Sequence, residues 1–205
     1  MIPRLHVVTD DGVLARDDFL GRAEQVLEAG ADVALHLRGP CTTGRRLADL
    51  AEALRDVATA SGAELLVNDR VDVALCSGLA GVHLGHRSLL PAEARALLGS
   101  DRLLGVSVHN MEEALEAVRG DAGFLLVGAL WATPSHQDQA SVGPNLLHEV
   151  ATAVSVPLLG IGGVTPERVP TILEAGAHGA AVLGGIWHVP SSGDAVQAYL
   201  QALAK

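Results

Sequence analysis

Short apolar stretches alternate along the chain with longer segments in which Ala, Leu and charged residues recur at helical spacing. The apolar stretches predict strands at residues 5–9, 33–38, 64–68, 81–84, 103–108, 124–127, 157–160 and 179–183. The alternation repeats roughly every 20–25 residues, which is typical of parallel strands joined by helices. Eight such units favour the α/β class and a closed (β/α)8 TIM barrel over an open sheet.

The helical segments between these strands are amphipathic and end in recognisable signals. Residues 19–29, 45–61 and 111–119 are rich in Ala, Leu and Glu, and Gly30 and Gly176 provide C-cap glycines. No linker or change of composition divides the sequence, so residues 1–205 are expected to form a single TIM-barrel domain. The first unit has no Gly-x-Gly-x-x-Gly, which argues against dinucleotide binding.

Composition and charge exclude several functions. Lys and Arg number 14 against 24 Asp and Glu, and aromatic residues make up only 2% of the chain. Nucleic-acid binding needs a basic surface and usually stacking aromatics, so it is not expected. The start of the chain resembles no signal peptide, and the uncharged residues 150–166 are interrupted by Pro157 and glycines. We therefore expect a cytoplasmic protein without membrane contact, with Cys41 and Cys76 as reduced, buried thiols.

Two pairs of glycines follow late strands. Gly162 and Gly163 end one apolar stretch, and Gly184 and Gly185 end the next. Paired glycines let backbone N–H groups approach an anion, and a following helix adds partial positive charge. Their place after strands seven and eight matches the phosphate site of TIM barrels. The pattern predicts a phosphorylated small-molecule ligand, although glycines that only make tight turns would look the same.

Alternation along the strands indicates which side chains face the barrel interior. His36 and Arg38 share one face of strand two, His83 faces inward on strand four, and Ser107 and His109 share a face of strand five. We expect them to converge near the C-terminal end, where imidazoles would suit proton transfer. Core histidines satisfied by neighbouring strands remain the alternative.

The segment from residue 131 to 143 is long and polar for a connection between a strand and a helix. It lies at the expected catalytic end, so it is a candidate lid over a bound substrate. Thr133 and Ser135 would contact the substrate, and His136 could reach the reacting centre. A solvated loop without a chemical role is the alternative.

Several motifs occur in a characteristic order: residues 5–10 (LHVVTD), 36–38 (HLR), 68–74 (NDRVDVA), 81–85 (GVHLG), 105–109 (GVSVH) and 160–166 (GIGGVTP). Together they resemble the thiamine-phosphate synthase and thiazole tautomerase (TenI-like) superfamily over nearly the whole chain. The resemblance implies a TIM barrel that acts on thiazole phosphates. It adds Asn68 to the substrate contacts predicted at Arg38, His83 and Ser107.

The synthases of this superfamily join a pyrimidine diphosphate to a thiazole phosphate and use Mg²⁺ to hold the departing diphosphate. The present chain departs from that pattern at three places. Gly39 follows Arg38 where a lysine is usual, Ser88 stands where a second metal carboxylate is expected, and His136 replaces a loop lysine. Asp69 remains as a ligand for Mg²⁺ under this reading.

The tautomerases move a proton on the thiazole phosphate carboxylate and need no metal. Their catalytic histidine would follow Gly128, where this chain has Ala129, so His136, His109 and His36 are the candidate acid–base groups. A metal-independent, cofactor-free thiazole phosphate tautomerase is our leading expectation. A divergent synthase and a non-catalytic binding or regulatory protein are the alternatives. The oligomeric state is open, a homo-oligomer included.

Overall fold

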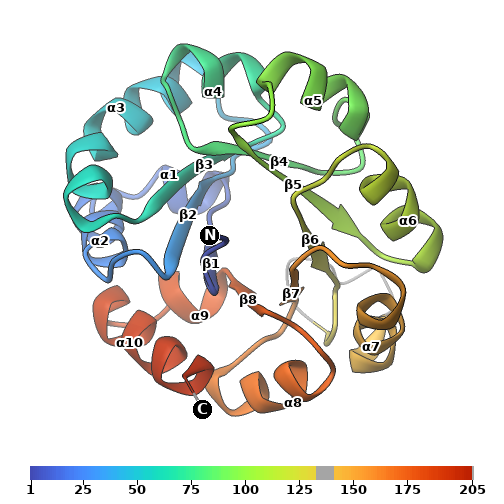
Figure 1. The fold of residues 1–205 in the computed structure, drawn as a ribbon. Coiled ribbons are helices and arrows are strands. Elements are labelled where there is room, and N and C mark those ends of the chain that lie inside the picture. The colour runs from blue at the N-terminus through green and yellow to red at the C-terminus, as the bar shows by residue number, and fades with distance from the viewer. Residues whose placement is uncertain (133–140, 205) are drawn as a thin grey trace.

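The structure, a computed structural model, describes residues 1–132 and 141–204, and its eight parallel strands close into a barrel (Figure 1). The strands are β1 (Leu5–Val8), β2 (Val33–Leu37), β3 (Glu64–Asn68), β4 (Gly81–Leu84), β5 (Leu103–Val108), β6 (Phe124–Val127), β7 (Leu158–Ile161) and β8 (Gly179–Val182). They pair in chain order, and β8 pairs with β1, Leu5 lying opposite Ala180. The predicted α/β TIM barrel is confirmed, and each predicted strand boundary lies within one residue of the observed one.

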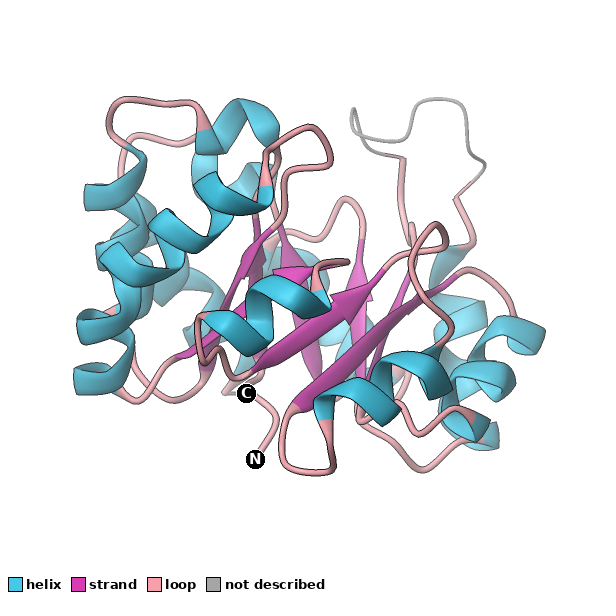
Figure 2. Ribbon diagram, turned by 90° about the horizontal axis from the view of Figure 1, so that it is seen from above, coloured by secondary structure: helices cyan, strands magenta, loops and turns pink. Residues whose placement is uncertain are grey.

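A ring of helices surrounds the barrel, and both termini lie at the end where the strands begin (Figure 2). The helices are α1 (Asp11–Leu14), α2 (Phe19–Leu27), α3 (Gly44–Ser61), α4 (Val71–Cys76), α5 (Pro91–Leu98), α6 (Met111–Arg119), α7 (Gly143–Ala153), α8 (Val169–Glu174), α9 (Gly184–Trp187) and α10 (Ser192–Leu203), with a 3₁₀ turn, η2 (Pro166–Arg168). In the described part of the chain, none of these helices has the length and apolar character needed to cross a bilayer.

Capping residues explain where the longer helices begin and end. The Thr43 side chain accepts a hydrogen bond from the Arg46 N–H and starts α3, and Gly62, at φ 78°, ends it. Asn110 caps α6 in the same way by accepting from the Glu113 N–H. These signals are local in sequence, so the boundaries of both helices could be predicted closely.

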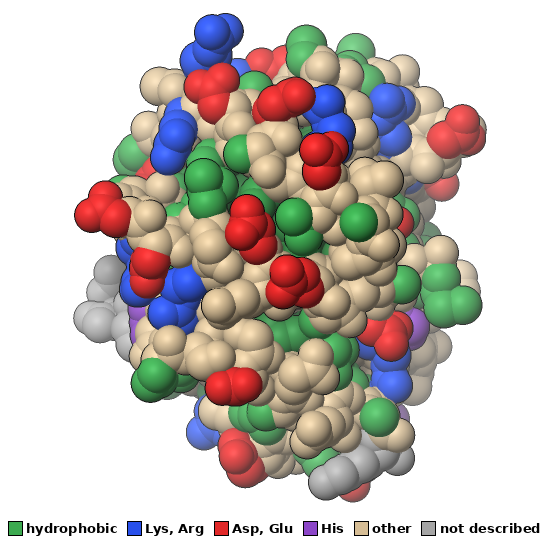
Figure 3. Space-filling model, turned by 90° about the vertical axis from the view of Figure 1, so that its left-hand side faces the viewer, with side chains coloured by type: hydrophobic (Ala, Val, Ile, Leu, Met, Phe, Trp, Pro, Cys, Tyr) green, Lys and Arg blue, Asp and Glu red, His purple; other side chains and the backbone are tan. Residues whose placement is uncertain are grey.

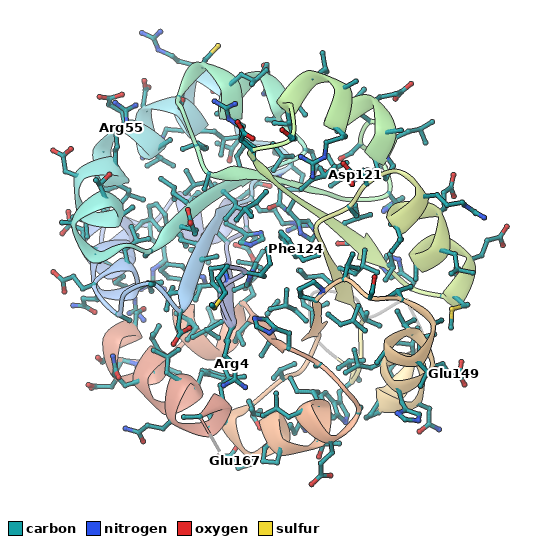
Figure 4. All side chains as sticks on the ribbon, in the orientation of Figure 1. Arg4, Arg55, Asp121, Phe124, Glu149 and Glu167 are labelled. Carbon is teal, nitrogen blue, oxygen red and sulfur yellow. The ribbon has the colours of Figure 1, made fainter. Side chains whose placement is uncertain are left out.

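The buried residues form two layers, one between the helices and the sheet and one inside the barrel. The inner layer is small and comprises Val8, Ala34, Leu66, Phe124, Leu126, Leu159 and Ala181. Figure 4 shows Phe124 directed into the centre of the barrel. A side chain at Gly105 would overlap the Phe124 ring, so this glycine makes room for the one large aromatic of the inner layer. The inner layer therefore closes the barrel from below and leaves its C-terminal end open for a ligand.

The outer surface is mixed in charge. On the face turned to the viewer in Figure 3, acidic and basic side chains are interspersed and hydrophobic groups are scattered. The expectation of buried thiols is wrong, because Cys41 and Cys76 are both free and exposed. Cys41 lies in the connection before α3, and Cys76 is the last residue of α4, so neither thiol packs under a helix.

Candidate active site

A cavity of about 650 Å³ opens at the C-terminal ends of the strands. This volume lies within the range of small-molecule sites, and the position is the usual one for TIM-barrel active sites. Residues that follow β1 through β8 line it, so one ligand can contact several strand ends at once. Of the substrate contacts predicted from the sequence, Arg38, Asn68, His83 and Ser107 all border this cavity.

The two glycine pairs lie next to each other, because β7 and β8 are neighbours, and all four glycines border the cavity. Gly162 and Gly163 have φ values of 94° and 65°, a conformation that other residues rarely adopt. Gly184 is the first residue of α9, so its N–H belongs to an unsatisfied helix N-terminus. The four glycines predicted to bind phosphate therefore lie close together. The interpretation of the sequence depended on this proximity.

Two aromatic side chains hold these glycine segments in place. The Tyr199 hydroxyl on α10 donates to the Val164 carbonyl at 2.9 Å, and burial raises the pKa of Tyr199 to about 12. The Trp187 Nε1–H on α9 donates to the Val8 carbonyl at 2.8 Å and so fixes α9 against β1. Both bonds are buried, which makes the glycine backbone a preformed surface.

A second polar region lies on the far side of the barrel, at the ends of β2, β3 and β4. Oδ1 of Asp69 accepts hydrogen bonds from the Gly85 N–H at 2.8 Å and from the Ser88 hydroxyl. Arg38 and Arg87 border the cavity at this side, and neither forms an ion pair with a carboxylate of the described residues. The region combines one carboxylate with two guanidinium groups.

His83 and Ser107 form the polar floor of the cavity between these regions. The His83 Nε2 atom and the Ser107 hydroxyl are 2.7 Å apart, and the imidazole is 1% exposed. Burial, followed by the charges of His36 and Arg38, holds the pKa of His83 well below its ordinary value. The ring is therefore neutral near pH 7 and serves as a hydrogen-bonding group.

His109 is paired with a carboxylate one helical turn further along the chain. Its Nδ1 lies 3.0 Å from Oε2 of Glu113, and its backbone N–H donates to the same oxygen at 2.7 Å. A carboxylate accepts, so Nδ1 carries the hydrogen and Nε2 is left for another partner. His109 also borders the cavity. This is the geometry of an imidazole oriented for proton transfer.

The structure moves His36 away from the place expected for it. The sequence put His36 at the cavity mouth with Arg38, but its imidazole is fully buried and does not line the cavity. The reason is the rise of the strand: inward-facing residues two positions apart occupy successive layers, so His36 lies one layer below Arg38. Its Nε2 is 2.8 Å from Nδ1 of His6, a residue that the sequence analysis did not single out.

Three further predicted residues, Thr133, Ser135 and His136, lie outside the described part of the chain. The residues on either side of them are described, and the preceding residue Trp131 contacts the segment with Gly162 and Gly163. Trp131 donates its N–H to the Gly162 carbonyl at 3.1 Å, and its ring lies 4.8 Å from the Arg168 guanidinium. The lid and the contacts assigned to these three residues stay predictions.

Sequence reasoning missed several cavity residues, among them Asp10, Arg87, Arg168 and His188. Each stands after a strand rather than within it, where alternation carries no information about direction. Arg87 could have been found from its place two residues after Gly85, at the end of β4. His188 could not, because only the short turn of α9 brings its ring near Gly184.

Comparisons with known proteins agree with this geometry. Residues 5–186 match the family model described as thiamine monophosphate synthase. The thiamine-phosphate synthase of Roseiflexus castenholzii is 36% identical over 98% of this chain and 88% of its own length. That of Chloroflexus aurantiacus is 39% identical over 89% of this chain and 84% of its own length.

Among solved structures, the thiamine phosphate pyrophosphorylase of Pyrococcus furiosus superposes with a TM-score of 0.85 at 26% identity. The superposition covers 98% of this chain and 95% of that chain. The resemblance drawn from the sequence motifs is confirmed by these matches.

Proposed function

Because the chain belongs to the thiamine monophosphate synthase family, we propose that it joins a pyrimidine diphosphate to a thiazole phosphate, giving thiamine phosphate. This replaces the tautomerase that the sequence analysis put first. The sequence analysis ranked the tautomerase above the synthase because the chain departs from the synthase pattern at Gly39, Ser88 and His136. Relatives that match almost the whole chain are named as synthases, which favours the alternative.

The observation that carries the proposal is that one cavity holds two separate regions whose groups are suited to binding anions. The glycine pairs lie after β7 and β8, and Arg38, Arg87 and Asp69 lie after β2, β4 and β3. In a closed eight-stranded ring, β3 and β7 are on opposite sides. A tautomerase binds one phosphorylated substrate, whereas a synthase binds two and must keep their phosphates apart. Two separated regions therefore suit the synthase better.

The residues around Asp69 fit a magnesium ion. Oδ1 of Asp69 already takes two hydrogen bonds, and Oδ2 takes none from the described residues. Mg²⁺ in such sites is held by one or two carboxylates together with substrate phosphates and water, so a single protein carboxylate suffices. Asp69 would hold the ion, with the Ser88 hydroxyl beside it. When bound, the ion would neutralise the charge that builds up on the departing diphosphate.

The protein's own groups have distinct tasks in this proposal. The glycine N–H groups hold the thiazole phosphate, and Arg38 and Arg87 pair with the diphosphate. Neutral His83 and Ser107 orient the pyrimidine by hydrogen bonds from the cavity floor. The reaction uses small phosphorylated metabolites, so we also propose a cytoplasmic location and no nucleic-acid or membrane partner. A homo-oligomer stays a prediction.

The deciding experiment incubates the protein with both thiazole phosphate tautomers, with and without pyrimidine diphosphate and Mg²⁺. Thiamine phosphate formed only when all components are present supports the synthase. Conversion of one thiazole tautomer into the other without pyrimidine or metal supports the tautomerase. If neither product forms although calorimetry detects ligand binding, the protein is a non-catalytic binder and the proposed synthase is wrong.

One observation favours the tautomerase as the second candidate. The hydrogen bond to Glu113 fixes the tautomer of His109. It leaves Nε2 as the ring atom that can exchange a proton with a substrate, as an acid–base catalyst requires. His109 could take the role of the family histidine that Ala129 replaces. We rank this second because Glu113 also takes part in the N-terminal cap of α6: its carboxylate accepts from the His109 N–H, and its own N–H donates to the capping residue Asn110. The contact between His109 and Glu113 therefore has a structural explanation as well.

A further inference from the structure

A chain of polar groups runs through the barrel from its floor toward the cavity. The Nε2 atom of His6 is 3.2 Å from the Pro3 carbonyl, and its Nδ1 atom is 2.8 Å from Nε2 of His36. Both imidazoles are fully buried and pack against Phe124, with ring centroids 4.9 and 6.5 Å from it. Water does not reach them, so each ring nitrogen must find its partner within the protein.

The Pro3 carbonyl at the floor of the barrel sets the direction of every hydrogen bond in this series of polar groups. It can only accept, so Nε2 of His6 carries the hydrogen. Burial, with further contributions from His36 and His83, holds the pKa of His6 well below its ordinary value, and the ring is neutral. Its Nδ1 must then accept, which makes Nε2 of His36 the donor. His36 is neutral as well, because burial lowers its pKa to about 4, so its Nδ1 is left as an acceptor.

The next group in the chain is the side-chain amide of Asn68, which interacts with His36 and also borders the cavity. Nδ1 of His36 and Oδ1 of Asn68 are both buried, and neither has a hydrogen-bond partner among the described residues. Two acceptors cannot bond to each other. The two ends of an asparagine amide have nearly the same shape, so its orientation follows from the network around it. A half-turn of the amide offers its N–H to His36 and directs Oδ1 toward the cavity.

We propose that His6, acting through His36, is a positioning residue that holds the Asn68 carbonyl toward the cavity, where it accepts a hydrogen bond from a ligand N–H. The group that fits is an exocyclic amino group on an aromatic ring. A carbonyl at the same place on the ligand would face the Asn68 carbonyl and be rejected. The amino-group preference rests on the proposed function, since it assumes a pyrimidine substrate. The hydrogen-bond direction within the barrel does not.

The first test uses the free protein and needs no ligand. Long-range ¹H–¹⁵N spectra at pH 7.5 distinguish the two neutral tautomers of each histidine. We expect His6 and His36 both to carry hydrogen on Nε2. Hydrogen on Nδ1 of either ring would overturn the proposed direction, whatever the protein catalyses.

Two variants of His6 separate positioning from packing. His6→Gln retains an N–H for the Pro3 carbonyl and an acceptor for His36, so it should preserve the His36 tautomer. His6→Leu keeps an apolar side chain of similar bulk but removes the acceptor, which frees His36 to move its hydrogen to Nδ1. The His36 tautomer should therefore change in His6→Leu alone. Tautomers that respond equally in both variants would contradict the proposal, and if His6→Leu fails to fold, the wild-type spectrum still decides.

The second test measures binding of 4-aminopyrimidin-5-ylmethyl phosphate and of the matching 4-oxo compound by calorimetry. Wild type and His6→Gln should prefer the amino compound by about tenfold or more, as expected when a mismatch leaves a buried polar group unpaired. His6→Leu should lose most of this preference. Equal affinities in the wild type would refute the amino preference. If the wild type binds neither compound, the proposed function fails. The spectra still decide the direction of the hydrogen bonds that run from Pro3 through His6 and His36.

Discussion

The Ser88 hydroxyl donates a hydrogen bond to Oδ1 of Asp69, across the gap between the end of β3 and the connection after β4. The resemblance to synthases led us to expect a second metal carboxylate at this serine. The contact brings the two side chains together at the entrance of the cavity. Under the proposed function, the departure from the family pattern would therefore change one ligand of the magnesium site. A serine there would leave the site with one negative charge in place of two.

Replacing Asp69 by asparagine should remove the magnesium dependence along with most of the synthase activity. Asparagine tolerates the φ of 63° at this position, so the backbone should not change. We expect turnover to fall by at least 100-fold, because the diphosphate would depart without charge neutralisation. Asp101→Asn is a matched control, since Asp101 also accepts from a serine hydroxyl but lies outside the cavity. Undiminished turnover in Asp69→Asn would show that this carboxylate holds no metal.

Ser88→Asp should have the opposite effect. A second carboxylate supplies another hard oxygen ligand, so the Mg²⁺ concentration for half-maximal activity should fall several-fold. Without the ion, two carboxylates face each other and the protein should melt at a lower temperature, which added Mg²⁺ restores. Ser100→Asp, next to Asp101, repeats the charge change on the surface. The same Mg²⁺ dependence in Ser88→Asp and wild type would speak against a metal site here.

His109→Gln tests the second candidate function. If His109 is the acid–base group, thiazole tautomerisation should slow by about 10²–10⁴-fold with little change in thiazole phosphate affinity. Glu113→Gln should slow it less, since the amide still accepts from Nδ1 but no longer stabilises a charged imidazole. His148→Gln, an exposed change on α7, is the control. Tautomerisation that proceeds at the wild-type rate in His109→Gln would leave the contact between His109 and Glu113 with a structural role only.

Gly184→Asp tests the phosphate site. A Cβ at Gly184 would lie 3.4 Å from Nδ1 of His188, an ordinary contact, so the side chain can be accommodated. The new carboxylate would repel a phosphate at the glycine pairs, and we expect thiazole phosphate affinity to fall at least tenfold. Gly21→Asp adds the same charge in open space on α2. Equal affinity in both variants would place the phosphate elsewhere in the cavity.

Hydrophobic periodicity and capping residues predicted most of the fold, because both depend on neighbours in the sequence. The strand boundaries and the faces of Arg38, His83 and Ser107 followed from alternation with a period of two. Alternation could not predict how deep a residue lies within the barrel, because depth depends on the stagger between strands. For this reason His36 was expected at the mouth of the cavity. Buried partners such as His6 were missed for the same reason. That residues 1–205 form one domain stays a prediction.

The buried histidines should make the stability of the protein depend on pH below neutrality. Burial lowers the pKa of His36 to about 4 and holds the pKa values of His6 and His83 well below the ordinary value. In the unfolded chain all three titrate near pH 6.5. Above about pH 6.5 these histidines are neutral in both states, so their titration does not change the free energy of unfolding. As the pH falls from there toward the folded pKa values, the unfolded state takes up protons that the folded state does not. Each group should then lower the free energy of unfolding by about 1.4 kcal/mol per pH unit.

Urea unfolding at pH 7.5, 6 and 5 measures this slope, and His36→Gln isolates one contribution. The glutamine does not titrate, so the variant should lose about 1.4 kcal/mol per pH unit less than the wild type between pH 6 and 5. The free energy of unfolding of the variant at pH 7.5 can differ from that of the wild type without affecting the test. Only the change of this free energy with pH measures proton uptake by His36. His148→Gln, an exposed histidine, should keep the wild-type slope. Parallel pH profiles for wild type and His36→Gln would mean that His36 takes up its proton over the same pH range in the folded and the unfolded protein, and a lowered pKa of the buried ring would then be excluded.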